Sequence, residues 1–292
     1  MKFPELHNDF IHHLREEGRA HATVLAYGKD IEQLLHFLHE KDKDSLMILT
    51  VTDVTTDHID EFKQSLKKLR YTPKSVSRKI NSIKTFFRFL KVRNLVQHNP
   101  AEAVIHPKYD QAEPRILGRL EYRALRDACK HDMRIAAIVE LLLQTGMRIS
   151  ELAGLKVSDV DLEKDKIRVS DPTSNLERTI PLNQAAKRAV QEYLKIRPKD
   201  VVEQIVFLTK TCRPFLVRNI RASIDRYFRV AGIKDAKVND LRHTFIVEQL
   251  KAGTPLTYVS RLVGHKRVTT TERYLDLIQQ SDQKAPLKLE EL

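Results

Sequence analysis

Cysteine and long apolar runs are scarce in this chain of 292 residues. Its two cysteines, Cys129 and Cys212, lie far apart and form no CxxC pair, so neither a disulfide framework nor a metal site of the zinc type is expected. No apolar run approaches the length of a membrane span, and the N-terminal MKFPELHNDF lacks the apolar core of a signal peptide. We therefore expect a cytoplasmic protein without a membrane partner.

Acidic residues are absent from one long stretch of the sequence. Residues 62–93 contain eleven Lys or Arg and no Asp or Glu, and the whole chain has 51 Lys and Arg against 39 Asp and Glu, a formal net charge of +12. A basic protein of this size most often binds a polyanion, and nucleic acid is a commoner partner than a membrane. The charge therefore predicts a protein that binds nucleic acid.

The basic stretch has the spacing of an amphipathic helix over residues 73–92. Its apolar residues would form a buried stripe: Val76, Ile80, Ile83, Phe87 and Leu90. The opposite face would carry cations, an amide and a hydroxyl: Lys74, Arg78, Asn81, Thr85 and Arg88. A merely solvated face is the alternative, but such faces usually mix charges of both signs, so we favour a surface that contacts DNA phosphates.

The sequence predicts two domains. Residues 1–107 have helical patterns only, over 23–40, 56–69 and 73–92. The segment 98–117 contains three prolines and no sustained period, and we place a linker in it at 108–116. A second domain then covers residues 117–292.

The second domain is predicted to be mainly helical with a small antiparallel sheet. Strand patterns occur only between Lys166 and Leu182, where KIRVS and ERTIPL flank the turn sequence DPTSNL. Helical patterns surround them, over residues 119–130, 133–144, 184–193, 217–230, 240–251, 255–263 and from 270. The fold class is therefore mainly α, with two domains.

Three segments of the second domain place polar groups at breaks in the apolar pattern. They are QTGMRISELAGL with Arg148 and Glu151, NDLRHTFIVEQLKAG with Arg242, and GHKRVTTTERYL with His265 and Tyr274. Each group has a structural interpretation: an Arg148–Glu151 ion pair, a surface ion pair for Arg242, a helix cap for His265, and a core aromatic for Tyr274.

Together these motifs resemble the tyrosine recombinase, or phage integrase, family of the Xer type. TGMRISEL is similar to the family's first arginine segment, and NDLRHTF matches its His-x-x-Arg box except at the first residue. Tyr274 lies nine residues after His265, the spacing of the family's nucleophile. Nearly the whole chain is covered, because residues 1–107 look like the family's SAM-like core-binding domain. Three ordered motifs make Tyr274 a predicted nucleophile rather than a core aromatic alone.

The resemblance implies a site-specific recombinase that clamps duplex DNA between its two domains. Arg148 and Arg242 would donate to the non-bridging oxygens of a phosphodiester, which guanidinium groups match in geometry. His265 would hydrogen-bond the same phosphate, and Glu151 would support the site. Tyr274 would attack phosphorus, leaving a 3′-phosphotyrosine and a free 5′-hydroxyl. The covalent link conserves the bond energy, so neither a cofactor nor a metal is expected.

The family also implies an assembly. We expect a homotetramer on DNA, in which a C-terminal tail carrying Leu287, Leu289 and Leu292 docks on a neighbouring protomer. A second recombinase as partner is left open.

Two positions depart from the family's pattern. Thr173 occupies the slot of a hairpin lysine, the presumed acid for the leaving 5′-oxygen, and Asn239 occupies the slot of the box histidine. Neither side chain titrates usefully, and general acid catalysis contributes about 10²- to 10⁴-fold. Lys166, Lys164 and Arg178 are candidates to replace the lysine. Two alternatives therefore stay open: a topoisomerase of type IB, and a DNA-binding protein with a weakened active site.

Overall fold

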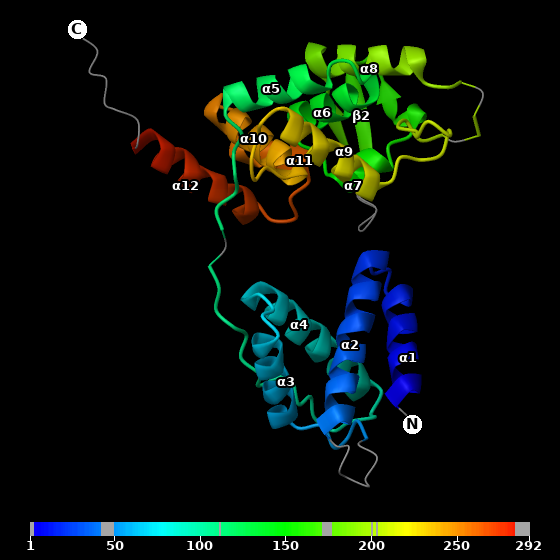
Figure 1. The fold of residues 1–292 in the computed structure, drawn as a ribbon, viewed down its shortest axis with the longest axis vertical. Coiled ribbons are helices and arrows are strands. Elements are labelled where there is room, and N and C mark those ends of the chain that lie inside the picture. The colour runs from blue at the N-terminus through cyan, green and yellow to red at the C-terminus, as the bar shows by residue number, and fades with distance from the viewer. Residues whose placement is uncertain are drawn as a thin grey trace. The chain divides into compact units, whose positions relative to one another are not determined.

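The computed structural model describes residues 3–41, 50–110, 112–170, 177–199, 201–202 and 204–283. The chain divides into two compact units, Met1–Gln111 and Ala112–Leu292 (Figure 1). Helices dominate both units, and the described strands form one antiparallel sheet of three strands in the second unit. The fold class predicted from the sequence, mainly α with a small antiparallel sheet, is confirmed. None of the helices in the described ranges is both long and apolar enough to cross a bilayer.

The first unit is helical throughout its described residues. Its helices are α1 (Phe3–Glu16), α2 (His21–Lys41), α3 (Thr56–Lys68) and α4 (Pro73–Val92). The stripe predicted on α4 is confirmed, since all five of its residues are fully buried: Val76, Ile80, Ile83, Phe87 and Leu90. Helix α1 was not predicted; Leu6, Phe10 and Leu14 repeat at four-residue spacing on it and are buried in the same core.

A buried carboxylate joins α2 to the basic helix α4. Asp30 is 1% exposed and accepts hydrogen bonds from Lys79 Nζ at 2.8 Å and Ser82 Oγ at 2.9 Å. Its two oxygens also pair with the two terminal nitrogens of Arg78. Part of the positive charge of α4 is therefore neutralised within the fold, although the Arg78 side chain stays 45% exposed.

The second unit packs its helices around α6. The elements are α5 (Arg119–Cys129), α6 (Met133–Thr145), α7 (Ile149–Ala153), η1 (Val157–Asp159), β1 (Val160–Asp161), β2 (Lys166–Ser170), β3 (Glu177–Pro181), α8 (Gln184–Ile196), α9 (Val217–Val230), α10 (Val238–Lys251), α11 (Leu256–Val263) and α12 (Thr269–Gln283). Helix α6 is apolar on most sides and contacts α5, α7, α8, α9 and α10 (Figure 1). Burial on most sides explains why its sequence shows little amphipathic pattern.

The sheet has a simple antiparallel register that fixes which side chains share a face. Strand β2 pairs with β1 and β3, and Val169 lies opposite Arg178. Ile167, Val169 and Ile180 are buried, so this face packs on the core. Because side chains alternate along a strand, Arg178 points to the core side, and Lys166 points to the opposite, solvent side.

Candidate active site

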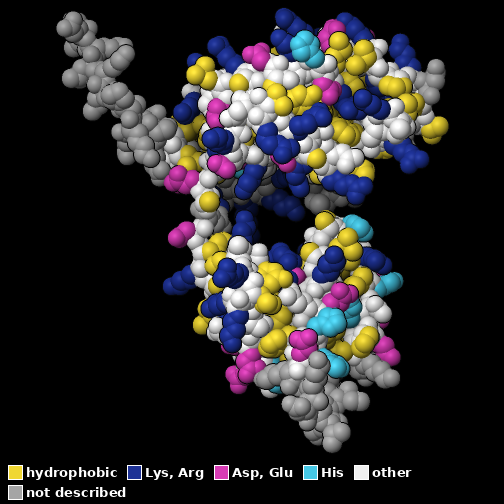
Figure 2. Space-filling view, viewed as in Figure 1, with side chains coloured by type: hydrophobic (Ala, Val, Ile, Leu, Met, Phe, Trp, Pro, Cys, Tyr) yellow, Lys and Arg dark blue, Asp and Glu magenta, His cyan; other side chains and the backbone are white. Residues whose placement is uncertain are grey.

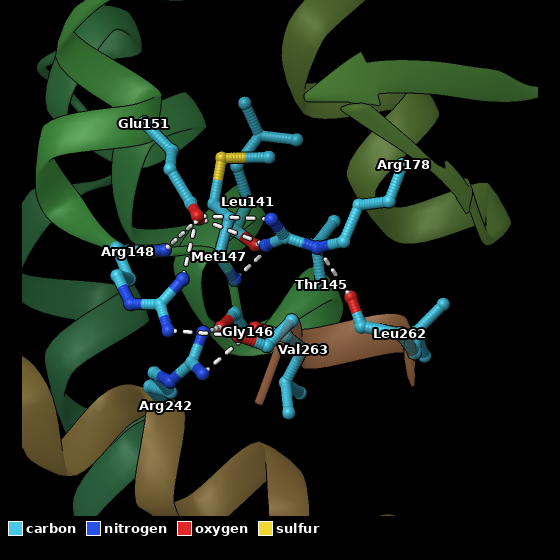
Figure 3. A network of polar contacts seen from close by, with 11 residues as sticks. Leu141, Thr145, Gly146, Met147, Arg148, Glu151, Arg178, Arg242, Leu262 and Val263 are labelled. Atoms are coloured by element: carbon cyan, nitrogen blue, oxygen red, sulfur yellow. Dashed lines mark hydrogen bonds and ion pairs between the residues drawn. The ribbon is translucent and has the colours of Figure 1, made fainter. Parts of the chain in front are cut away.

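The site begins at the corner between α6 and α7. Gly146 ends α6 with φ 60°, a left-handed conformation that favours glycine. A Cβ atom there would also lie 2.3 Å from Cδ1 of Phe245 on α10, so the close approach of the two helices requires a glycine. Arg148 follows as the N-cap residue of α7, on the side of the corner that faces α10 and α11 (Figure 3).

Glu151 is the buried carboxylate that organises this corner. Its side chain has no exposed area, and its oxygens accept from the Arg148 backbone N–H at 2.6 Å and from Arg148 Nη1 at 2.8 Å (Figure 3). Two nitrogens of Arg178 donate to it at 2.9 and 2.8 Å. Burial would raise the pKa of Glu151, but the hydrogen bonds from Arg178 and Arg148 outweigh it and lower the pKa. Glu151 is therefore ionised at neutral pH.

Arg178 is a positioning residue whose role the sequence did not indicate. It reaches Glu151 from β3, and its Nε donates to the Leu262 carbonyl of α11 at 2.8 Å. With 14% of its side chain exposed, it joins the sheet, α7 and α11. A guanidinium so engaged is a poor proton donor at neutral pH, so Arg178 does not replace the missing acid.

Two arginines lie side by side on successive backbone carbonyls. Arg242, 6% exposed on α10, donates to the Gly146 carbonyl and, at 2.8 Å, to the Val263 carbonyl. Arg148 Nη2 donates to the next carbonyl, Gly264, also at 2.8 Å. Burial and the neighbouring charge of Arg148 lower the pKa of Arg242 to about 10. The guanidinium of Arg242 stays charged at neutral pH, and the positive charge of Arg148 repels it.

His265 follows these carbonyls at the end of α11. Its backbone N–H donates to Ser260 at 3.0 Å, so the predicted capping role is present, while its ring Nδ1 is 2.7 Å from Oγ1 of the buried Thr271. Burial, followed by the charges of Arg242 and Arg148, lowers the pKa of His265 to about 4. The ring is therefore neutral at pH 7. When Thr271 donates to Nδ1, Nε2 carries the hydrogen and can donate to an anion.

Tyr274 is a buried aromatic whose hydroxyl contacts a polar side chain. Its ring is 6% exposed and packs in a small cluster with Phe245 and Val263. Its hydroxyl, however, is 2.6 Å from Nδ1 of His243, and its ring lies 6.4 Å from the ring of His265 between centroids. Burial raises the pKa of Tyr274, and the charge of Arg242 lowers it only in part. The hydroxyl is thus protonated at neutral pH.

Asn239 and His243 form a chain that ends on Tyr274. The Asn239 side-chain nitrogen is 2.7 Å from Nε2 of His243, one turn further along α10. The HTF motif includes His243, but the sequence assigned it no role. Its position directly after Arg242 was the only available signal, because the contact with Tyr274 spans 31 residues.

A cavity of about 470 Å³ lies beside Arg242 and Asn239. Its lining consists of Leu142, Met147, Ile149, Arg221, Asp225, Lys237, Val238, Asn239 and Arg242. Lys237 is the only lysine among these lining residues, and the sequence did not single it out.

Other predicted residues are not brought to this cluster. Lys166 is exposed on the opposite face of the sheet from Arg178, and Lys164 is exposed beyond the same end of β2. Thr173 lies outside the described residues, so its relation to the cluster is not described. In the first unit, Lys74, Asn81 and Arg88 are exposed and Thr85 is half-buried, on one face of α4. Figure 2 shows Lys and Arg side chains spread over the visible surface of both units, with Asp and Glu between them.

Comparison with protein families agrees with this arrangement. A model of the phage integrase family matches residues 115–281, and a model of the phage integrase N-terminal SAM-like domain matches residues 8–94. The chain belongs to the phage integrase family. Members of this tyrosine recombinase family break and rejoin DNA strands in site-specific recombination, which confirms the reaction class and the enzyme expected from the sequence.

Individual relatives cover nearly the whole chain. A tyrosine recombinase XerC from Roseiflexus castenholzii is 33% identical over 93% of this chain and 88% of its own. A crystal structure of XerA recombinase is 27% identical, with a TM-score of 0.54 over 98% of this chain and 100% of its own. A lambda integrase tetramer bound to a Holliday junction shares the fold, with a TM-score of 0.73 at 17% identity, over 92% of this chain and 79% of its own.

Proposed function

We propose that this chain cleaves and rejoins duplex DNA through a 3′-phosphotyrosine formed by Tyr274. The observation that carries the proposal is the convergence of two guanidiniums and an imidazole near the Tyr274 hydroxyl. Arg242 and Arg148 donate to the successive carbonyls of Val263 and Gly264, and the ring of His265, the next residue, lies 6.4 Å from the Tyr274 ring between centroids. Forked guanidinium donors match the charge and the geometry of a phosphodiester.

Each group of the cluster then has a chemical task. Arg148 and Arg242 donate to the non-bridging oxygens, where charge builds up in the transition state, and each such donor contributes about 10²- to 10³-fold in rate. Neutral His265 donates a further hydrogen bond through Nε2. The Tyr274 oxygen bonds to phosphorus as the bond to the 5′-oxygen breaks. Attack by a 5′-hydroxyl of another strand reverses these steps, so no metal or nucleotide cofactor is required.

The proton for the leaving 5′-oxygen needs a source other than the hairpin lysine. Lys237 is the candidate that the cavity beside Arg242 and Asn239 adds. A substrate with sulfur at the 5′-bridging position tests this, because a thiolate leaves without a proton. Lys237→Ala should slow cleavage of the oxygen substrate alone, and Thr173→Lys should restore it. Equal slowing of both substrates would mean that Lys237 has another role.

The proposed function includes an assembly of several protomers on DNA. We expect the two units to bind opposite sides of duplex DNA, with the basic face of α4 on the phosphates. A homotetramer, with or without a second recombinase, would act on two sites in the cytoplasm. The lambda integrase tetramer on a Holliday junction supports such an assembly. Tail exchange through Leu287, Leu289 and Leu292 belongs to this proposal, and those residues lie outside the described ranges.

A suicide substrate tests the proposal directly. Duplex DNA nicked so that the 5′-hydroxyl fragment diffuses away should trap the wild-type chain covalently. Tyr274→Phe should bind the same DNA with similar affinity and form no adduct. An adduct with the Phe variant would assign the nucleophile elsewhere.

Two other results would select an alternative function. Relaxation of supercoiled DNA without exchanged products would indicate a topoisomerase of type IB. Tight DNA binding by the wild type without any adduct would indicate a weakened active site, as Asn239 and the threonine in the slot of the hairpin lysine suggest.

A further inference from the structure

The hydroxyl of Tyr274, the proposed nucleophile, contacts a histidine, His243. The proposed function gives this histidine no role at the phosphate. Nδ1 of His243 is 2.6 Å from the Tyr274 hydroxyl, a short hydrogen bond between a ring nitrogen and the atom that would react. The rings are 5.7 Å apart between centroids and tilted by 39°. A base in contact with the attacking atom meets the geometric requirement for general base catalysis.

The reaction needs such a base. Burial raises the pKa of Tyr274, so the phenol does not ionise unaided at neutral pH. Asn239 has replaced the box histidine and cannot accept the proton, because an amide does not titrate. His265 contacts Thr271 through Nδ1, and its ring is the second imidazole of the site. His243 is the described imidazole that contacts the Tyr274 oxygen.

Asn239 gives His243 the second contact that a base requires. For Nδ1 to accept the phenol proton, the neutral ring must carry its hydrogen on Nε2, which is 2.7 Å from the Asn239 amide. Rotation of that amide by half a turn presents its carbonyl oxygen to Nε2–H and leaves the rest of the side chain in place. Asn239 is therefore a positioning residue for His243.

The charges around His243 favour a neutral ring. Burial lowers the pKa of His243, Asp240 on the same helix raises it, and Arg242 lowers it again. From the other elements, Tyr274 of α12 and His265 of the preceding loop face the ring, and Arg221 and Asp225 of α9 line the cavity that reaches Asn239. At pH 7 the imidazole is neutral and can accept a proton.

We propose that His243 is the general base that activates Tyr274, with Asn239 holding its tautomer; the inference rests on the proposed strand cleavage. As the Tyr274 oxygen bonds to phosphorus, its proton moves to Nδ1 of His243. The electron pair of the broken P–O bond stays on the 5′-oxygen, which takes a proton from the separate donor. During rejoining, the His243 imidazolium returns its proton to Tyr274 as the phenol leaves.

The test measures the rate of adduct formation on the suicide substrate in a single turnover. His243→Asn places an amide close to the position of Nδ1, which keeps a hydrogen bond to Tyr274 but accepts no proton. We expect the rate to fall about 10²- to 10⁴-fold, the usual contribution of general base catalysis. His131→Asn, an exposed histidine of the same unit, is the matched control and should react like the wild type.

Two further measurements separate a base from a structural contact. Replacing Tyr274 with a fluorinated tyrosine lowers the phenol pKa, so the loss caused by His243→Asn should shrink. The wild-type rate should decline as pH falls through the pKa of His243, below 6.5, and Asn239→Asp should move that decline to higher pH because a carboxylate stabilises the imidazolium.

The outcomes distinguish the base from the proposed function. If the wild type forms the adduct but His243→Asn reacts at the wild-type rate, the proposed base is overturned and strand cleavage stands. A loss that is the same with fluorotyrosine, together with an unmoved pH profile for Asn239→Asp, also overturns it. If the wild type forms no adduct, both proposals fall.

Discussion

Each unit of the chain buries one carboxylate that holds two basic side chains, and the two carboxylates have different consequences. Asp30 accepts from Arg78 and Lys79, which are neighbours on α4, so the pair fixes α2 against α4 within one helical unit. Glu151 accepts from Arg148 at the start of α7 and from Arg178 on β3, so it ties separate elements together.

The two carboxylates differ in where the other donors of their arginine and lysine partners point. Arg148 has a nitrogen left for the Gly264 carbonyl, next to the carbonyl that binds Arg242. The second unit thereby holds two guanidiniums side by side, whereas Asp30 neutralises Lys79 and part of Arg78 within the first unit. A buried carboxylate thus stabilises the fold in one unit, and in the other it positions an arginine of the proposed phosphate site.

The sharpest test of this comparison removes each carboxylate. Glu151→Ala and Asp30→Ala should each cost about 3–5 kcal/mol in the free energy of unfolding, because each leaves a buried cation, Arg178 or Lys79, without its partner. Only Glu151→Ala should also abolish the covalent DNA adduct, since Arg148 loses its anchor. Denaturant titration and the suicide substrate measure the two effects. If an Ala variant does not fold, Glu151→Gln and Asp30→Asn replace it, because they keep the size and shape of the side chain. Equal adduct yields from the Glu151 and Asp30 variants would contradict the proposed difference between the two carboxylates.

A smaller effect is expected when the cation rather than the carboxylate is changed. Arg148→Lys should slow adduct formation about 10²- to 10³-fold with DNA affinity retained, because the donors of an ammonium lie on a single nitrogen, whereas Arg148 reaches Glu151 and Gly264 with two separate nitrogens. Arg126→Lys is the matched control, since Arg126 pairs in a bidentate way with Glu140 outside the site. Comparable losses in both variants would show that a general loss of ion pairing, and not the site, is measured.

The role of the first unit should appear in the salt dependence of binding rather than in the rate. Joint replacement of Lys74, Arg78 and Arg88 by Gln should reduce the slope of log affinity against log salt by about 0.9 for each phosphate that the protein no longer neutralises. Arg78→Gln alone should change the slope less than Lys74→Gln, because Asp30 already occupies part of the Arg78 guanidinium. An unchanged slope for the triple variant would place the DNA on another surface.

The smallest effect concerns pH. The pKa of Glu151 is depressed in the folded chain, so its contribution to stability is present above the ordinary value of 4.5 and is lost as pH falls through the folded pKa. The difference in unfolding free energy between the wild type and Glu151→Gln should therefore be largest near neutral pH and narrow below 4.5. A difference that stays constant down to pH 3 would mean that ionisation of Glu151 contributes nothing.

The parts of the fold that have a clear period were predictable. The stripe on α4 and the two strands around residues 171–176 follow helical and alternating patterns, which local geometry enforces. Helix α1 was missed although Leu6, Phe10 and Leu14 repeat on it at four-residue spacing. Strand β1 was missed because two residues offer no alternation from which a period can be recognised. The ion pair of Asp30 with Arg78 was also missed, since 48 residues separate the partners.

The site divides in the same way. The motifs of the sequence determined Arg148, Glu151, Arg242, His265 and Tyr274 as candidates, because each lies at a fixed spacing within a local segment. Tertiary structure alone decided that Arg178 reaches Glu151, that the carbonyls of Val263 and Gly264 hold the two guanidiniums, and that His243 meets the Tyr274 oxygen. These contacts join α10, α11, α12 and the sheet through hydrogen bonds between residues distant in sequence. Residue spacing determines only local placement, and packing of the elements determines which distant donor meets which acceptor.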